Sequence, residues 1–301
     1  MIDQTTTKEM PSLKSMENII HIDEKWFDMT KRSITYHLLP KEDPLRTIQN
    51  KNSIGKVMFL IAVAKPRYAE QRNVIFDGKV GIWAFVIESA AKYNSKYRYK
   101  GTIEPKTIIV TRDVIREYLC EKVAPAIAEL WPDDGHEGPI FIQQDNARTH
   151  VLPDDPAFIA VVKATGMDIK LNYKPPNSLD MNVLDLCFFS SIQSLAFESA
   201  PNTLKELTES VEQAYDAYEV DKLAKVYITS QSVLVEVMKD GGNKNKTPHI
   251  GKDKLQREGM LPNTLNVDGE LYRKTFELIA DYEQQVIALA QTMIPGSIYE
   301  T

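Results

Sequence analysis

The sequence has few cysteines and no long hydrophobic run. Cys120 and Cys187 are the only two cysteines among 301 residues, which excludes a disulfide-built scaffold and a cysteine-built zinc site and fits a reducing compartment. The longest apolar run, 57–64, is far shorter than the ~20 residues that cross a bilayer. The N-terminus lacks the basic segment and apolar stretch of a secretory signal. We therefore expect no membrane partner.

The chain also lacks an excess of positive charge. It has 36 Lys and Arg against 42 Asp and Glu, which gives a formal net charge of −6. This balance argues against a protein that binds nucleic acid by overall electrostatics alone, but it leaves room for a local DNA site. With 43% hydrophobic and 26% charged residues, the chain has the composition of a folded protein with a sizeable core.

The hydrophobic pattern predicts strands first, then alternating helices and strands, then helices. Strands are expected at 18–27, 33–39, 56–64, 139–144 and 167–173; helices are expected at 111–131, 155–165, over most of the chain from the Pro175-Pro176 break to 239, and at 271–293, with a loop at 240–265. This order indicates an α/β fold in which helices flank a mixed sheet. We expect one domain, 17–301, with an insertion at about 65–106, preceded by a tail or linker remnant at 1–16.

Two carboxylates lie in or directly after predicted strands. Asp23 interrupts an apolar strand, where a carboxylate is unfavourable unless it is paired, hydrogen-bonded or bound to a metal; a solvent-facing Asp on a half-buried strand is the alternative. Asp145 follows the strand at 139–144, at the end where open α/β sheets present groups to ligands. An ordinary turn made by Asp145 and Asn146 is equally compatible with the pattern.

A third carboxylate, Asp185, lies on a predicted helix. Its apolar stripe also contains Met181, Phe188, Phe189 and Ile192. This spacing predicts that Asp185 points to the core rather than to water, and the alternative is an Asp at the stripe edge paired with a Lys. Asp180, just before the helix, is predicted to cap its N-terminus.

Two strands and a helix that each deliver one carboxylate indicate a site for hard divalent cations. Mg²⁺ takes few protein ligands, usually one or two carboxylates together with water and substrate phosphates. Two such ions about 3.5–4 Å apart can activate the attacking oxygen and stabilise the leaving oxygen in phosphodiester chemistry.

The strings around these acids resemble those of a known family. HIDEKWF at 21–27, FIQQDNARTH at 141–150 and KPPNSLDMNVLDLCFF at 174–189 look like the three catalytic blocks of mariner-type transposases, which belong to the ribonuclease H-like superfamily. FDGKVGIWAFV at 76–86 is similar to a stretch of the plant-type group. The 39 residues between Asp145 and Asp185 (146–184) match the interval of that branch. The resemblance extends over about 18–262.

The resemblance implies a fold, a chemistry and an assembly. It implies a ribonuclease H-like sheet of five strands with additional C-terminal helices, in which Asp23, Asp145 and Asp185 are the catalytic residues and bind two Mg²⁺ ions, with Mn²⁺ as a substitute. It further implies hydrolysis of a phosphodiester at transposon ends, attack of the freed 3′-hydroxyl on target DNA, a homodimer and a nuclear location. Such transposases begin with helix-turn-helix modules, which we expect to be absent from this chain.

Two other readings of the resemblance remain open. One is a truncated or domesticated derivative that binds DNA or dimerises without catalysis, and the other is a stand-alone nuclease of the same superfamily. Retention of all three acids argues against the derivative, and the expected absence of the recognition modules argues for it.

Two basic patches are candidate DNA contacts, because cations neutralise phosphates and aromatic rings stack on exposed bases. The first contains Lys92, Lys96, Arg98 and Lys100 with Tyr93, Tyr97 and Tyr99 between them; the second contains Lys244, Lys246, Lys252, Lys254 and Arg257. Each is equally compatible with a solvated loop. His150 is a further candidate for contact with phosphate or the metal site, with a structural role as the alternative.

Overall fold

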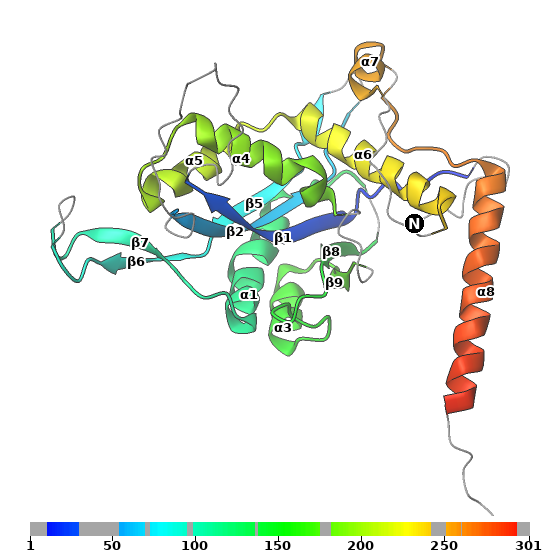
Figure 1. Cartoon of the computed structure of the whole chain (residues 1–301), viewed down its shortest axis with the longest axis horizontal. Helices are drawn as coiled ribbons and strands as arrows, with labels where there is room; N and C mark the ends of the chain where they lie inside the picture. The colour runs from blue at the N-terminus through cyan, green and yellow to red at the C-terminus, as the bar shows by residue number, and fades with distance from the viewer. Residues whose placement is uncertain are drawn as a thin grey trace, which may run out of the picture. The chain divides into compact units, whose positions relative to one another are not determined.

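The computed structural model describes residues 11–29, 54–69, 73–94, 99–135, 138–174, 182–241, 251–259 and 261–293 (Figure 1). The chain divides into two compact units, one of Met16–Val226 and one of Met1–Ser15 with Tyr227–Thr301. The strand predicted at 33–39 and the predicted helix cap, Asp180, lie outside the described residues.

A mixed sheet of five strands organises the larger unit. Its order is β5 (Lys79–Ala84), β2 (Lys56–Ala64), β1 (Ile19–Asp28), β8 (Ile140–Gln144) and β9 (Ile169–Tyr173). β2 is antiparallel to both β5 and β1, whereas β1, β8 and β9 are parallel to one another. The predicted mixed sheet is therefore confirmed, and β1, which carries Asp23, is its central strand.

Helices cover both faces of this sheet. α1 (Arg112–Tyr118), the π-helical segment η3 (Leu119–Val123) and α2 (Ala124–Leu130) follow one another without a break; α3 (Pro156–Thr165), the π-helical segment η5 (Leu184–Phe188), α4 (Phe189–Glu198) and α5 (Leu204–Asp216) come later in the chain. α1 and α3 lie on one face and α4 and α5 on the other (Figure 1). The helices predicted at 111–131 and 155–165 are thus confirmed, and Thr111 and Asp155 cap them.

The core fixes which face of β1 carries the site. Ile20 and Ile22 pack in one buried cluster with Ile115 of α1 and Phe158 of α3. Because side chains alternate along a strand, His21 and Asp23 point to the opposite face, which α4 and α5 cover.

The segment predicted as an insertion, 65–106, contributes both to the main sheet and to two small ribbons. It supplies β5 to the five-stranded sheet, a ribbon of β3 (Arg67–Tyr68) and β4 (Val74–Phe76), and an antiparallel ribbon of β6 (Val86–Ala90) and β7 (Ile103–Thr107). The β6–β7 ribbon extends beyond the five-stranded sheet (Figure 1).

The smaller unit combines segments from both ends of the chain. Its helices are the later part of α6 (Val220–Lys239), α7 (Lys252–Arg257) and α8 (Gly269–Met293). Gln231 joins the two segments, because its side chain donates to Lys14 O at 3.1 Å and accepts from Leu265 N–H at 2.8 Å. The range 240–265 was predicted as a loop, which is wrong for the part that forms α7. Among the described residues, no helix is long and apolar enough to cross a membrane.

Candidate active site

Asp23 lies on the central strand with little access to solvent. Its side chain is 13% exposed, and its Oδ1 accepts a 2.7 Å hydrogen bond from Glu24 N–H. Burial raises the pKa of Asp23 to about 6, with Glu24 and Asp185 adding to the shift and the Lys174 ammonium opposing it. The alternative of a solvent-facing carboxylate on a half-buried strand does not fit this environment.

Asn182 connects Asp23 with Asp185. Its buried side-chain amide donates from Nδ2 to Asp185 Oδ2 at 2.8 Å and to Asp23 Oδ2 as well. Its Oδ1 accepts from Leu184 N–H at 3.2 Å, which fixes the amide at the start of the helix. Since both carboxylate oxygens bond to one nitrogen, the structure brings these two predicted acids together.

The prediction that Asp185 points to the core is wrong. Asp185 is exposed, although Phe188, Phe189 and Ile192 of the predicted stripe are buried. The cause is η5, a π-helical turn in which Phe189 N–H bonds to Leu184 O. This wider turn shifts Asp185 off the α-helical stripe and places it at the edge of the site, beside Asn182.

Asp145 lies at the end of β8, beside the end of β1. His21 pairs with Gln143 in these parallel strands, so Asp23 and Asp145 occupy equivalent positions two residues further along. Asp145 Oδ1 accepts from Ala147 N–H at 2.8 Å, so the turn expected from the Asp-Asn pair does form. The carboxylate is nevertheless available, since its side chain is 39% exposed.

His150 contacts Asp145 and holds its carboxylate in place. This buried imidazole contacts Asp145 Oδ1 through Nδ1 at 2.8 Å and Glu24 Oε2 through Nε2 at 3.0 Å. Burial would lower the pKa of His150, but the hydrogen bond and charge of Glu24, together with Asp145, raise it to about 9. The imidazolium therefore bridges two acids, which is a positioning role in this structure rather than direct exposure to phosphate.

The donor set fits a hard divalent cation, although it does not form a closed cage. Within the described residues, no three Asp, Glu, His or Cys side chains gather closely enough to hold a metal ion. However, Mg²⁺ needs only one or two protein carboxylates, and oxygens of Asp23 and Asp185 already converge on one amide nitrogen. The repulsion between the carboxylates is reduced by three neighbours. Asn182 donates hydrogen bonds to two of them, and the positive charges of His150 and Lys174 lie close by.

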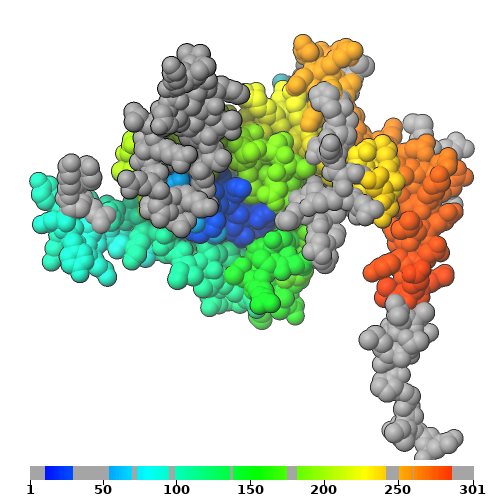
Figure 2. All heavy atoms as spheres, viewed as in Figure 1, coloured from blue at the N-terminus to red at the C-terminus, as the bar shows by residue number. Residues whose placement is uncertain are grey.

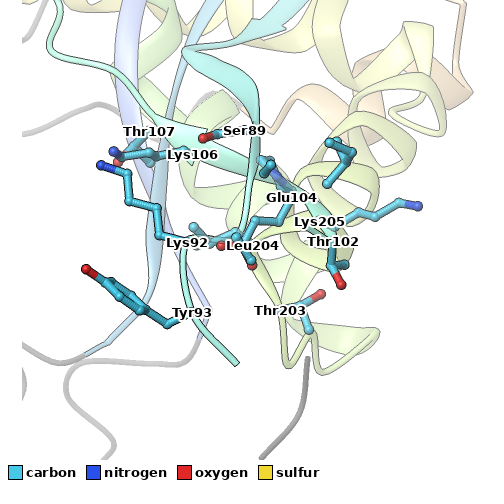
Figure 3. Close-up of a pocket in the computed structure, with 14 residues that line it drawn as sticks. Ser89, Lys92, Tyr93, Thr102, Glu104, Lys106, Thr107, Thr203, Leu204 and Lys205 are labelled. Atoms are coloured by element: carbon cyan, nitrogen blue, oxygen red, sulfur yellow. The ribbon is translucent and has the colours of Figure 1, made fainter. Parts of the chain in front are cut away.

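The candidate DNA contacts are distributed over both units. Lys92 and Lys100 are exposed at the β6–β7 ribbon, where Tyr93 and Tyr99 are also exposed. Lys92 and Tyr93 line a hollow between this ribbon and the start of α5 (Figure 3). The ribbon forms a protrusion, and β1 reaches the surface on the same face (Figure 2). Lys96 and Arg98 lie outside the described residues.

The second patch is only partly described, because Lys244 and Lys246 lie outside the described residues. Lys254 and Arg257 are exposed on α7. Lys252 is half-buried, and its ammonium bonds to the Thr229 hydroxyl within the smaller unit. The DNA-binding role of both patches stays a prediction.

Sequence reasoning missed three residues of the site: Glu24, Asn182 and Lys174. All three lie inside the strings that carry the family resemblance, at 21–27 and 174–189. Their proximity to the acids was therefore open to inference from the strings. The contacts through which they act join residues more than a hundred positions apart, and no local pattern predicts those.

Comparison with known proteins gives structural neighbours only. No profile of a known protein family and no curated protein matches the chain. A pre-cleavage Mos1 transpososome has a TM-score of 0.51 at 14% sequence identity, over 77% of this chain and 58% of that chain. A Mos1 strand transfer complex gives 0.49 at 14%, over 77% and 56%, and the catalytic domain of Mos1 mariner transposase gives 0.40 at 14%, over 77% and 85%.

The likeness to the pre-cleavage transpososome supports the fold alone. At 14% identity, the match to the transpososome, over 77% of this chain, shows the ribonuclease H-like α/β fold that the sequence strings predicted. In this fold Asp23 lies on the first strand of the main sheet, Asp145 follows the fourth strand and Asp185 lies on η5, after the fifth strand; the mariner resemblance implies the same order, with the third acid on a following helix. The chain spans a little over half the length of the Mos1 chains in these complexes.

Proposed function

We propose that this chain is the catalytic domain of a mariner-like, cut-and-paste DNA transposase. It would hydrolyse a phosphodiester at transposon ends. The freed 3′-hydroxyl would then attack a phosphodiester of target DNA, which forms a new phosphodiester and releases a 3′-hydroxyl of the target strand. The observation that carries the proposal is the junction at Asn182, where the carboxylates of Asp23 on β1 and Asp185 on η5 accept hydrogen bonds from one amide nitrogen. Such a junction on a ribonuclease H-like sheet supports phosphodiester chemistry more than a purely structural role.

The three acids would divide the work of holding two Mg²⁺ ions, or Mn²⁺ in their place. Asp23 and Asp145, on neighbouring strands, and Asp185, beside Asn182, would hold the ions. When bound, such ions activate the attacking oxygen and stabilise the leaving oxygen. Asn182 would fix the rotamers of Asp23 and Asp185, and His150 would fix that of Asp145. Because the attacking oxygen would come from water or from a DNA 3′-hydroxyl, no protein nucleophile is needed.

The proposed substrate and assembly follow from the same chemistry. The exposed cations and tyrosines of the β6–β7 ribbon would contact DNA next to the acids, with Lys92 and Lys100 as the first candidates. Two transposon ends must be brought together for transposition, so we propose a homodimer. Action on chromosomal DNA would place the protein in the nucleus.

The direct test is strand cleavage and joining on a DNA duplex with a pre-exposed 3′ end, with Mg²⁺ or Mn²⁺. The wild-type chain is compared with Asp145→Asn and with a matched control, Asp168→Asn. Asp168 is an exposed Asp that precedes β9, at the opposite end of the sheet from the site, and pairs with Lys170. We expect joined product from the wild type and the control and none from Asp145→Asn. No joined product from any of the three proteins would favour a derivative that binds DNA or dimerises without catalysis. Equal joining by all three would contradict the role of Asp145.

A further inference from the structure

Lys174 is anchored to the strand that presents Asp145. Its N–H donates to Gln144 O at 2.8 Å, and its carbonyl accepts from Asn146 Nδ2 at 2.7 Å. Gln144 and Asn146 flank Asp145 in sequence, so the backbone of Lys174 is fixed on both sides of that acid. The direction of its side chain is therefore set by the sheet rather than by a free loop.

The sheet register places Lys174 in line with charged residues of the two neighbouring strands. His21, Gln143 and Asn172 pair across the parallel strands β1, β8 and β9. Since every second residue of a strand points to the same face, the next row on that face is Asp23, Asp145 and Lys174. A lysine thus continues a row that begins with two of the proposed metal ligands.

The ammonium is buried among carboxylates without a hydrogen bond to any of the described residues. Its side chain is 6% exposed, and Nζ lies 3.8 Å from Asp23 Oδ2. The charges of Asp185, Asp145 and Glu24 also act on it. A buried ammonium is unfavourable unless opposite charges compensate it, and here the compensation comes from the acids of the candidate site.

The geometry differs from that of an ordinary structural ion pair. A pair that serves stability has short, directed hydrogen bonds, as Arg67 has to Asp134 at 2.6 Å. Lys174 instead lies 3.8 Å from Asp23 Oδ2 with no hydrogen bond to any described residue, and the charges of Asp185, Asp145 and Glu24 also act on its ammonium. The Lys174 ammonium therefore acts on several acids through its charge and not through a directed hydrogen bond to one of them.

We propose that Lys174 is the resident counter-cation of the acid cluster, which holds the carboxylates together in the metal-free protein and opposes the binding of divalent ions. This inference rests on the proposed function, because it concerns the same metal site. Lys174 is a positioning residue in this account. Its positive charge lies where it repels an incoming ion, so its removal strengthens metal binding and makes the fold more dependent on metal.

The test is calorimetric titration of Mn²⁺ into the wild-type chain, Lys174→Met and Lys170→Met. Lys170 is the matched control, because it lies on β9 on the same face of the strand but is exposed and pairs with Asp168. We expect Lys174→Met to bind Mn²⁺ at least about tenfold more tightly than the wild type, a difference of about 1.4 kcal/mol. Lys170→Met and the charge-preserving Lys174→Arg should bind like the wild type.

Thermal unfolding gives a second readout that does not depend on activity. With EDTA and then with saturating Mn²⁺, the rise in Tm should be larger for Lys174→Met than for the wild type. If Lys174→Met does not fold without metal, Lys174→Gln replaces it in both measurements. Equal or weaker Mn²⁺ binding by the charge-neutral variants would overturn the inference.

Asp23→Asn separates this inference from the proposed function. If the wild type binds Mn²⁺ and Asp23→Asn does not, the metal site stands, and the Lys174 variants decide the inference alone. If the wild type and Asp23→Asn both fail to bind Mn²⁺, the proposed metal-dependent function fails together with the inference built on it.

Discussion

Two carboxylates with little exposure to solvent, Asp155 and Asp23, lie in contrasting environments. Asp155 is 10% exposed and accepts from Ala157 N–H and Phe158 N–H at 3.1 Å and from Arg116 Nε at 2.9 Å. Asp23 is 13% exposed and has one backbone N–H, one side-chain amide and a cation at 3.8 Å as its neighbours, with other carboxylates close by.

The pKa values of the two carboxyl groups shift in opposite directions. Burial would raise the pKa of Asp155, but the Phe158 N–H and the Arg116 guanidinium outweigh it and lower that pKa. Burial raises the pKa of Asp23 to about 6 despite Lys174. Burial alone therefore does not identify a functional acid; the neighbouring acids and the fewer hydrogen-bond donors distinguish Asp23 from Asp155.

Of the changes at these two carboxylates, Asp23→Asn should have the largest effect on DNA joining. We expect the rate of DNA joining to fall by at least about a thousandfold, since a charged group at the reacting centre is lost. The free energy of unfolding in EDTA should change less than for Asp155→Ala, because the gain from burying a neutral amide is offset by the loss of the negative charge beside the Lys174 ammonium. Joining assays and urea unfolding measure the two effects. A variant that is less stable yet fully active would contradict the account.

Asn182→Ala tests the junction that holds Asp23 beside Asp185. We expect Mn²⁺ affinity to fall by about 10- to 100-fold, which is the usual effect of losing a group that orients metal ligands. The free energy of unfolding should also fall, since Leu184 N–H loses its acceptor. Mn²⁺ titration followed by unfolding in EDTA separates the two effects. Unchanged affinity would show that Asn182 only caps the helix.

Asp155→Ala is the structural counterpart. Loss of the cap of α3 and of the Arg116 partner should lower the free energy of unfolding by about 2 kcal/mol. Mn²⁺ affinity should not change, because Asp155 lies on the other face of the sheet with α3. Chemical denaturation and metal titration of the same preparation check both statements. A parallel loss of metal binding would remove the distinction between the two acids.

The smallest effect concerns pH. The pKa of Asp155 is lower in the folded than in the unfolded state, so its charge stabilises the fold above the unfolded pKa of about 4. This contribution disappears as the pH falls through the folded pKa. The difference in unfolding free energy between the wild type and Asp155→Asn should thus be present at pH 6 and shrink below pH 4. Denaturation curves over this range measure it, and a constant difference would contradict the assignment.

Local patterns predicted the elements better than the contacts. A continuous apolar run rich in β-branched residues predicted a strand at 56–64, and β2 has these bounds, because such a run suits a strand that is buried on both faces. The same reasoning placed Asp23 on a strand and Asp145 at the end of one. It failed for Asp185, since an α-helical period cannot anticipate the π-helical turn at η5. It also missed Lys174, whose role depends on a sheet register that pairs distant segments.

Metal-directed backbone cleavage tests directly whether Asp23, Asp145 and Asp185 form one metal site. Fe²⁺ takes oxygen-ligand sites similar to those of Mg²⁺, and with ascorbate and peroxide it produces hydroxyl radicals that cut the chain beside the bound ion. We expect cuts near residues 23, 145 and 185. Excess Mg²⁺ should suppress these cuts, and Asp23→Asn should abolish them. Cuts elsewhere, or the same cuts in Asp23→Asn, would contradict a metal site built from these three acids.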